Sequence, residues 1–393
     1  MIRNCGGRTI AHLANDSICS WNLDAVTLNT LSKVVPTIIC DSVLIAVTCR
    51  VTNKYAMLTQ NGRVLVGVGS SNYIEDITDL IPLASRGELK GCDTEIFLDA
   101  RTRVSFGTLA IKTQTSISFV YVGIQMEDKA KGIHVKYIGT EIYPSGINMF
   151  GVDSWRAVVR TNSNSLYSIK IGYEGITSSE IHHPEVENIQ QLVCANSHIF
   201  ILKQDGIVCE RSINGSMPGQ VDVFNEESVS KIITGGPHVF FITVGGMCYY
   251  LNYDIHGYRH PRLIGALEGY HVESLFVLRD RVIFQHDGNR LCFLHLAYYE
   301  DYRFYSGRID SQHIVNSTTP HPLPFCEDMS IVSAENIGQH IIFITDEGRA
   351  YSALALNLES QPLVEIPFFA DRPLMIRNRV TAIKSAASDP RDT

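Results

Sequence analysis

The chain has 393 residues, which is enough for two or three domains or for one large repeat architecture. With 45% hydrophobic and 19% charged residues, its composition is that of a globular protein, and this excludes disorder over most of the chain. The 33 Lys and Arg and the 41 Asp and Glu give a formal net charge of −8, with no block of five like charges. This charge argues against a protein that binds nucleic-acid backbones, so direct binding to naked duplex DNA is predicted to be weak.

The N-terminal residues, Met1 to Gly7, lack the apolar run of a secretory signal. No segment approaches the roughly 20 apolar residues of a membrane-spanning helix. We therefore expect an intracellular chain, cytoplasmic or nuclear, that does not enter a membrane. The ten cysteines are scattered singly without the spacing of a zinc site, so they are predicted to be reduced core thiols.

Helical periodicity is almost absent, whereas paired apolar runs separated by tight polar turns recur along the whole chain, which is typical of β-hairpins. The clearest unit, Lys231 to Tyr250, reads strand, glycine turn, strand, glycine turn, strand. In chain order, the predicted hairpins are Thr9–His12 with Ile18–Trp21, Tyr55–Leu58 with Arg63–Val66, Leu109–Ile111 with Ile117–Val120, Ala157–Val159 with Leu166–Ile169, His198–Leu202 with Ile207–Cys209, Val239–Val244 with Met247–Tyr250, Val282–Phe284 with Leu291–Phe293, and His340–Ile344 with Arg349–Tyr351.

The turns of these hairpins mark a repeat. Several contain Asn-Gly or Asp-Gly, which favour type I′ turns because both central positions need positive φ. The eight turn positions are Asp16, Asn61, Thr115, Ser163, Asp205, Gly245, Asp287 and Glu347, and successive ones are 40 to 60 residues apart. This period predicts an all-β fold: a single closed β-propeller of seven, possibly eight, four-stranded blades that spans residues 1–393.

A propeller blade buries its faces only against its neighbours, so the two ends of the chain must meet. Nothing that resembles a first strand precedes Thr9. Arg379–Lys384 follows the last repeat and resembles that missing strand, so the ring is predicted to close through N- and C-terminal strands paired in one blade. Residues 385–393 are then expected to form a flexible tail.

One repeat resembles a specific family pattern. Gly235-Gly236-Pro237-His238, Val244-Gly245-Gly246 and the segment Asn252 to Gly257 resemble the repeat of the regulator-of-chromosome-condensation family of propellers. The resemblance implies a propeller that is either a scaffold or a guanine nucleotide exchange factor for a small GTPase of the nuclear-transport type. The chain departs from the family pattern in two ways. The Gly-Gly pair that precedes the repeat histidine is kept only at Gly235-Gly236, and Tyr55 and Trp155 replace the repeat histidine in two other units.

Motifs for chemistry are absent from the sequence. It has no Gly-x-Ser-x-Gly elbow, no phosphate-binding glycine loop and no placed nucleophile and base, so no catalytic, cofactor-binding or metal-ligating residue is predicted. The repeat histidines His198, His238 and His340 are predicted to be hydrogen-bonded core residues. We therefore expect a protein without enzymatic activity and without a cofactor.

The longest interruption between strong repeats, residues 298–328, is predicted to be an insertion between blades. Aromatic residues and arginine are enriched at the centres of protein interfaces, so this insertion is a candidate partner-binding site; the alternative is an extra outer strand that covers a blade. The candidate residues are Tyr298, Tyr299, Asp301, Tyr302, Arg303, Phe304 and Tyr305.

The sequence thus predicts a monomeric scaffold for protein–protein interaction. Its partner is expected to be a protein, possibly a small GTPase, and the negative net charge makes a basic partner more plausible than a nucleic acid. The exchange-factor function is the alternative.

Overall fold

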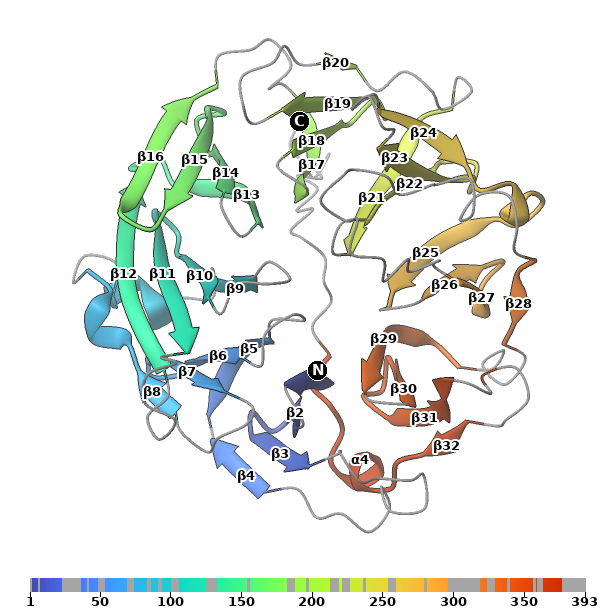
Figure 1. Ribbon diagram of the computed structural model, residues 1–393, viewed down its shortest axis with the longest axis horizontal. Helices are drawn as coiled ribbons and strands as arrows, with labels where there is room; N and C mark the ends of the chain where they lie inside the picture. Colours follow the sequence, from blue (N-terminus) through green and yellow to red (C-terminus); the bar gives the residue numbers. More distant parts are fainter. Residues whose placement is uncertain are drawn as a thin grey trace, which may run out of the picture.

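The computed structural model shows a ring of eight four-stranded antiparallel sheets (Figure 1). Each sheet is one blade, with its first strand nearest the centre of the ring and its fourth strand at the rim. The blades follow one another round the ring in chain order. The structure describes residues 2–5, 8–22, 37–40, 42–48, 54–68, 74–82, 86–90, 94–99, 106–124, 133–153, 156–181, 188–195, 198–212, 219–220, 227–235, 238–253, 259–278, 281–295, 319–323, 329–337, 340–355, 358 and 363–376.

The first four blades include the longest outer strand of the described part of the chain, β12. Two 3₁₀ helices, η1 (Thr78–Leu80) and η2 (Gly87–Lys90), connect blade 2 to blade 3. The strands are β1 (Ile2–Cys5), β2 (Arg8–His12), β3 (Ile18–Asn22) and β4 (Thr37–Cys40) in blade 1; β5 (Val43–Thr48), β6 (Lys54–Thr59), β7 (Val64–Val68) and β8 (Ile74–Asp76) in blade 2; β9 (Glu95–Asp99), β10 (Phe106–Lys112), β11 (Ser116–Ile124) and β12 (Ile133–Ile142) in blade 3; and β13 (Ile147–Asp153), β14 (Arg156–Thr161), β15 (Leu166–Gly172) and β16 (Gly175–Glu180) in blade 4.

In three of the last four blades the outer strand has only two residues. A 3₁₀ helix, η4 (Gly265–Leu267), follows blade 6, and one turn of α-helix, α4 (Phe368–Asp371), follows blade 8. The strands are β17 (Ile189–Ala195), β18 (His198–Lys203), β19 (Val208–Ser212) and β20 (Gly219–Gln220) in blade 5; β21 (Val229–Gly235), β22 (His238–Thr243), β23 (Cys248–Tyr253) and β24 (Arg259–Leu263) in blade 6; β25 (Val272–Val277), β26 (Arg281–His286), β27 (Arg290–His295) and β28 (His321–Pro322) in blade 7; and β29 (Ile331–Ile337), β30 (His340–Thr345), β31 (Ala350–Leu354) and β32 (Val364–Glu365) in blade 8.

The predicted β-propeller is therefore confirmed, with eight blades, the larger of the two numbers that the sequence left open. All eight predicted turn positions lie between the second and third strands of a blade. The turn type differs from the prediction. Only blade 7 has two consecutive turn residues with positive φ, Asp287 and Gly288. Six of the other turns are three-residue loops in which only the third residue, such as Gly62 or Gly348, has positive φ.

Eight separate apolar clusters hold the ring together, one at each boundary between blades. Consecutive residues of the second strand of a blade point to opposite faces and therefore enter different clusters. In β18, Ile201 packs toward blade 4 and Leu202 packs toward blade 6. Burial on both faces explains why these strands read as continuous apolar runs in the sequence.

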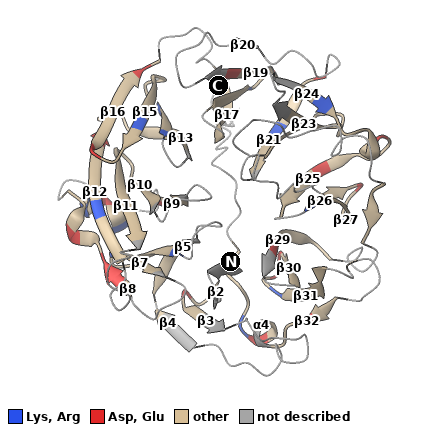
Figure 2. Cartoon of the chain, viewed as in Figure 1, with Lys and Arg blue, Asp and Glu red and all other residues tan. Residues whose placement is uncertain are grey.

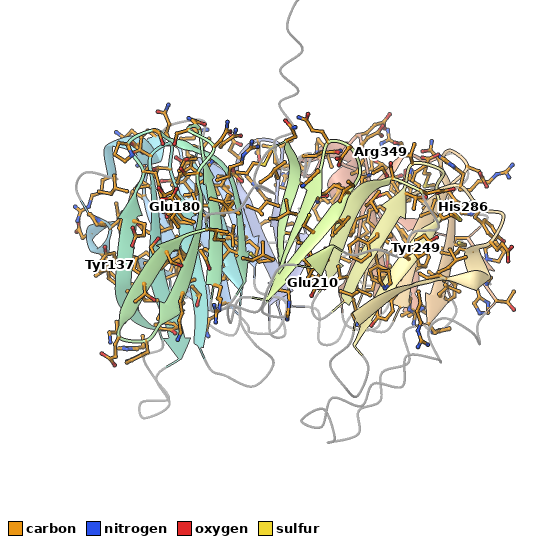
Figure 3. The ribbon with its side chains drawn as sticks, turned by 90° about the horizontal axis from the view of Figure 1, so that it is seen from above. Tyr137, Glu180, Glu210, Tyr249, His286 and Arg349 are labelled. Carbon is orange, nitrogen blue, oxygen red and sulfur yellow. The ribbon has the colours of Figure 1, made fainter. Side chains whose placement is uncertain are left out.

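Backbone hydrogen bonds link the blades on one side of the ring, which we call the turn face because it carries the eight hairpin turns. A turn carbonyl of one blade accepts a hydrogen bond from the amide that begins the next blade. Examples are the Gly206 carbonyl with the Val229 amide, at 3.0 Å, and the Gly246 carbonyl with the Val272 amide, at 2.9 Å. Figure 3 shows the ring from the side, with Arg349 and His286 toward this face and Glu210 toward the opposite one.

The same bond closes the ring between blade 8 and blade 1. The Leu374 amide donates to the Gly348 carbonyl in the turn of blade 8, at 2.8 Å. The next residues then pair with β2, because the Met375 amide donates to the His12 carbonyl and the Ala14 amide donates to the Pro373 carbonyl, both at 2.8 Å. The rest of β2, from Ala11 back to Arg8, pairs with β1, in which Ile2 lies opposite Ala11. The innermost strand of blade 1 is thus completed by Pro373–Met375 together with β1.

The two termini therefore do meet in one blade, but through residues other than those predicted. Ile2–Cys5 supplies most of the first strand that the sequence appeared to lack, and Pro373–Met375 supplies its beginning. A short strand with few apolar residues gives a weak signal in the sequence, which is why β1 was missed. The predicted closing strand Arg379–Lys384, the tail 385–393 and most of the predicted insertion 298–328 lie outside the described residues.

The turn of blade 8 should be sensitive to a side chain at Gly348. This residue has φ +80°, and an added Cβ would lie 2.5 Å from the Leu374 carbonyl oxygen, a backbone atom that cannot move aside easily. Gly288 has φ +89° but no atom within 4 Å of the added Cβ. We expect Gly288→Ala to cost about 1 kcal/mol of unfolding free energy and Gly348→Ala about 3 kcal/mol, because only the latter adds overpacking to the left-handed backbone. Urea unfolding of both variants tests this, and equal losses would contradict it.

Two truncations should separate Pro373–Met375 from the segment that follows. A chain that ends at Arg372 loses the burial of Leu374, which is 1% exposed, and should lose about 2 kcal/mol or more. A chain that ends at Ile376 keeps all the pairs described above and should unfold like the full chain. Thermal unfolding measures both. Destabilisation of the longer truncation would instead assign closure to residues beyond 376.

Candidate functional site: the turn face of blades 5 to 7

The repeat histidines occupy the first position of the second strand in their blades and are structural. His238 Nδ1 lies 3.1 Å from the Tyr250 hydroxyl, and His340 Nδ1 lies 3.2 Å from the Ser352 hydroxyl. Both histidines are buried, as predicted. His198 is slightly more exposed, at 12%, and its Nδ1 lies 2.9 Å from Glu210 Oε1.

In each of these three pairs, the partner lies twelve residues further along the chain, on the third strand. Blade 7 has a pair with the same twelve-residue separation but with a cation–π contact instead of a hydrogen bond. The Arg281 guanidinium lies over the Phe293 ring, 5.4 Å from its centroid. The strand register also corrects one sequence assignment. Lys54 and Arg156, which begin β6 and β14, occupy this position, rather than Tyr55 and Trp155.

The partner site predicted from the sequence, Tyr298 to Tyr305, lies outside the described residues, so it stays a prediction. Within the described ranges, no group of three or more His, Cys, Asp or Glu side chains is placed to hold a metal ion. No helix in the described part of the ring is long and apolar enough to span a membrane. Lys and Arg are scattered singly over the described blades (Figure 2).

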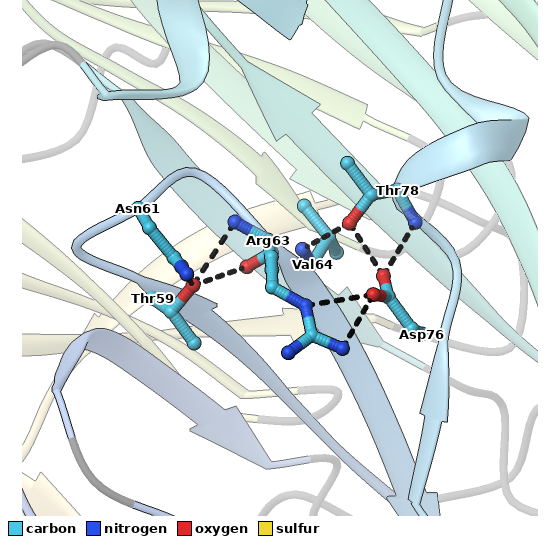
Figure 4. A network of polar contacts seen from close by, with 6 residues as sticks. All are labelled: Thr59, Asn61, Arg63, Val64, Asp76 and Thr78. Atoms are coloured by element: carbon cyan, nitrogen blue, oxygen red, sulfur yellow. Dashed lines mark hydrogen bonds and ion pairs between the residues drawn. The ribbon is translucent and has the colours of Figure 1, made fainter.

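The charged side chains on the turn face of blade 2 form ion pairs and hydrogen bonds with one another (Figure 4). Arg63 binds Asp76, with a shortest separation of 2.7 Å, and Asp76 also accepts hydrogen bonds from the amide and hydroxyl of Thr78. These contacts lower the pKa of Asp76 although partial burial opposes them. Arg86 binds Asp79 at 2.9 Å close by. This part of the turn face therefore stabilises the fold and presents little unsatisfied charge.

The turns of blades 5 to 7 form a different surface, which we call the arc. Hydrogen bonds connect its parts: the Ser228 hydroxyl donates to the Asp205 carbonyl at 3.1 Å, and the Ser228 carbonyl accepts from the Val244 amide at 2.8 Å. On the other side of the blade 6 turn, His271 Nδ1 lies 3.0 Å from the Gly245 carbonyl oxygen, and the His271 carbonyl accepts from the Asp287 amide. The arc therefore has a fixed backbone that spans three blades.

Two apolar side chains stand at the tips of the arc. Val244 is 66% exposed and Ile207 is 37% exposed, which is unusual for aliphatic side chains in well-ordered turns. Val244 is the first residue of the blade 6 turn, a position that β-hairpin geometry normally gives to polar residues, and Ile207 directly follows the blade 5 turn. The two side chains add exposed apolar area to a surface that the hydrogen bonds above hold in place.

Carboxylates surround these tips: Asp205, Glu227, Glu273 and Asp287. Backbone amides hold two of them, because Ile207 donates to Asp205 at 3.0 Å and Gly288 donates to Glu273 at 2.8 Å. Among the described residues, no Lys or Arg forms an ion pair with Asp205, Glu227 or Glu273.

The remaining contacts in the arc involve one lysine and two polar rings. The Lys231 ammonium donates to the backbone carbonyl of Glu273 at 3.1 Å. His286 Nδ1 lies 3.0 Å from Asp287 and lowers the pKa of that carboxyl by hydrogen bonding. Burial raises the pKa of the nearby Tyr249, and the negative charge of Glu227 raises it further. The arc therefore combines exposed aliphatic groups with several acidic side chains, which is complementary to a partner that carries cations beside an apolar side chain.

Sequence reasoning located every turn of the arc but not the arc itself. Val244 and Ile207 are 37 residues apart in the chain, and the sequence placed each in a predicted strand beside a turn. Aliphatic residues are expected beside hairpin turns, so neither gave a signal of its own. Their shared face depends on the order of the blades in space.

Comparisons with known proteins give no family for the chain, since no family model and no curated protein matches it. Solved structures similar to it include yeast RCC1 (Prp20) bound to Kap60, at 9% identity over 79% of this chain and 84% of that one, with a TM-score of 0.45. Human WBSCR16 is similar at 14% identity over 65% and 79%, with a TM-score of 0.41. The computationally designed Ika8 protein is similar at 10% identity over 90% and 95%, with a TM-score of 0.47. These likenesses carry no argument about activity or partners, and membership of the regulator-of-chromosome-condensation family stays a prediction.

The buried His238 should make stability depend on pH. Burial lowers its pKa from 6.5 to about 4, so the folded protein holds this ring neutral while the unfolded chain takes up a proton below about pH 6.5. The stability from this residue is therefore complete above that pH and is lost as the pH falls toward 4, by about 2 kcal/mol between pH 7 and pH 5. Urea unfolding at both pH values should show a smaller loss in His238→Gln. His271→Gln, at an exposed histidine, is the control; equal pH dependence in both variants and the wild type would contradict the assignment.

Proposed function

We propose that the chain is a non-enzymatic propeller scaffold that binds a basic segment of a protein partner on the arc. The observation that carries this proposal is the exposure of Val244 and Ile207 near Asp205, Glu227 and Glu273, three carboxylates that form no ion pair with a described Lys or Arg. Aliphatic tips supply apolar contact area, and the surrounding carboxylates attract cations and orient the partner.

The contrast with blade 2 supports the proposal. There, Arg63 and Arg86 neutralise the carboxylates of the same face, so a partner would have to break existing ion pairs. In the arc, the acidic groups Asp205 and Glu273 are held by backbone amides instead. Such carboxylates are fixed in position, yet they keep lone pairs and negative charge for an incoming Lys or Arg.

The first test measures binding of two labelled peptides by fluorescence anisotropy. One peptide carries Lys and Arg around a single leucine, and the other carries Glu in place of the cations. We expect the basic peptide to bind more tightly and its affinity to fall as salt rises from about 50 to about 200 mM, since exposed charges are screened over this range. Val244→Ser, which removes the apolar contact without adding charge, should weaken binding about tenfold, equivalent to 1.4 kcal/mol. Val364→Ser, at an exposed apolar site on blade 8, is the matched control and should bind like the wild type.

Equal affinity for the two peptides, or equal affinity of the Val244→Ser variant and the wild type, would contradict the proposal. A second assay addresses the alternative function. The purified chain is mixed with small GTPases that carry labelled GDP, and nucleotide release is followed. Release at the intrinsic rate is expected of a scaffold, whereas accelerated release would favour an exchange factor.

A further inference from the structure

The outer strands of the ring differ in how their open edges are protected. An outer strand leaves backbone N–H and C=O groups on one side without a sheet partner, and proteins normally shorten such strands or mark them with Lys, Arg, Pro or a bulge. Within the described residues, β4, β8, β20, β28 and β32 have two to four residues each. Three outer strands are longer: β12, β16 and β24.

Two of these three long strands carry the usual protection. β24 contains Arg259, Pro261 and Arg262. β12 contains Lys136, and its register with β11 shifts between Phe119 and Val120. β16 has the sequence Gly-Ile-Thr-Ser-Ser-Glu, with neither Lys, Arg nor Pro, and it pairs with β15 without a register shift. Its last four residues are exposed.

The hydrogen bonds of the blade show which backbone groups of β16 face outward. The Ile181 amide donates to the Leu166 carbonyl at 2.7 Å, so this pair is a hydrogen-bonded one. Hydrogen-bonded pairs alternate along an antiparallel ladder, which makes Ser179 and Thr177 the next residues bonded to β15. Ile176 and Ser178 therefore direct their N–H and C=O groups away from the sheet, toward the rim.

The surroundings of this edge indicate what it would bind. Tyr173, 46% exposed, and Ile142, 57% exposed, are large apolar side chains beside β16, one in the β15–β16 turn and one at the end of β12. Lys136 joins the two outer strands, because its ammonium lies 3.8 Å from the centroid of the Tyr173 ring and 3.6 Å from Glu174. On the face that β16 turns toward blade 3, Ile176 packs closely against Gly139 of β12. A Cβ added to Gly139 would lie 2.7 Å from the Ile176 side chain.

Carboxylates outnumber cations beside β16. Glu174 and Glu180 are exposed and Glu141 lies on β12; the described cations next to them are Lys136, which binds Glu174, and the exposed Lys170, which lies opposite Thr177 of β16. An extended segment with Lys or Arg and with apolar side chains at alternate positions would satisfy these features together. Its backbone would pair with Ile176 and Ser178, its apolar groups would cover Tyr173 and Ile142, and its cations would meet the carboxylates.

We propose that the open edge of β16 is a second binding site, which takes up an extended basic and apolar segment of a partner protein as a fifth strand of blade 4. The site is independent of the arc, which lies on blades 5 to 7. The two sites differ in chemistry, because the edge recognises the backbone of its ligand and the arc recognises side chains. This difference provides the test.

The probe is a fluorescein-labelled nine-residue peptide in which valine alternates with threonine and lysine. A second peptide of the same sequence is N-methylated at alternate amides, so it cannot donate to a strand edge. We expect the first peptide to bind at least about tenfold more tightly, since it alone forms the backbone hydrogen bonds. Hydrogen exchange should show that the Ile176 and Ser178 amides exchange rapidly in the free protein and become protected by the first peptide.

Two substitutions at one residue separate backbone from side chain. Ser178→Pro removes an outward N–H, which an edge strand tolerates without loss of its own ladder, and should lower affinity about tenfold. Ser178→Ala keeps the N–H and should bind like the wild type, as should Val244→Ser in the arc. Circular dichroism and unfolding confirm that each variant is folded.

Several results would overturn the proposal. They are the absence of saturable binding or amide protection up to about 1 mM peptide, equal binding of the N-methylated peptide, and equal loss in Ser178→Ala and Ser178→Pro. Self-association would protect these amides without any peptide. Sedimentation that depends on protein concentration, and that Ser178→Pro abolishes, would assign the edge to a second copy of the chain. Loss of binding in Val244→Ser together with retention in Ser178→Pro would place the peptide on the arc.

Discussion

Every blade of this protein has two apolar faces and can bury them only against the blades on either side. The second strands show this constraint most clearly: all six residues of β6, β22 and β30 are buried. A strand of this kind is unstable at the end of an open row, because one of its faces would be left in water. The ring must therefore close, and the cluster that joins Ala11 and Cys19 to Ile342 and Phe369 is as necessary as any other.

The hairpin turns extend the same constraint to the surface. A left-handed residue at the third position lets the turn carbonyl point at the next blade, where it accepts a hydrogen bond from a backbone amide in place of water. Glycine serves at most of these positions because the neighbouring blade leaves no room for a side chain: a Cβ on Gly206 would lie 2.3 Å from the Ser228 side chain, and one on Gly246 would lie 2.4 Å from His271. Local turn chemistry and blade packing thus depend on the same residues.

The candidate binding surfaces are places where this scaffold leaves groups unused. In blade 2, arginines neutralise the carboxylates and the polar groups satisfy one another. In the arc, backbone amides position the carboxylates without neutralising them, and aliphatic tips stand beside them. At the rim of blade 4, β16 keeps the regular pairing of an inner strand although it is at an edge. Both surfaces are held in place by the ring before a partner binds. Binding would therefore cost little conformational entropy in this protein.

The sequence by itself determined the repeat, the eight hairpin turns, the all-β class and the structural role of His238 and His340, because these follow from local signals: alternating or continuous apolar runs, Gly-containing turns and a fixed spacing between them. It also required the termini to meet. Only the tertiary structure decided which residues meet, since the pairing of Leu374 with Leu13 joins segments more than 350 residues apart and leaves no periodic trace in either. The arc and the open edge of β16 were decided there too. Each depends on which side chains and backbone groups remain exposed once neighbouring blades have packed, and exposure of that kind is a property of the closed ring rather than of any one segment.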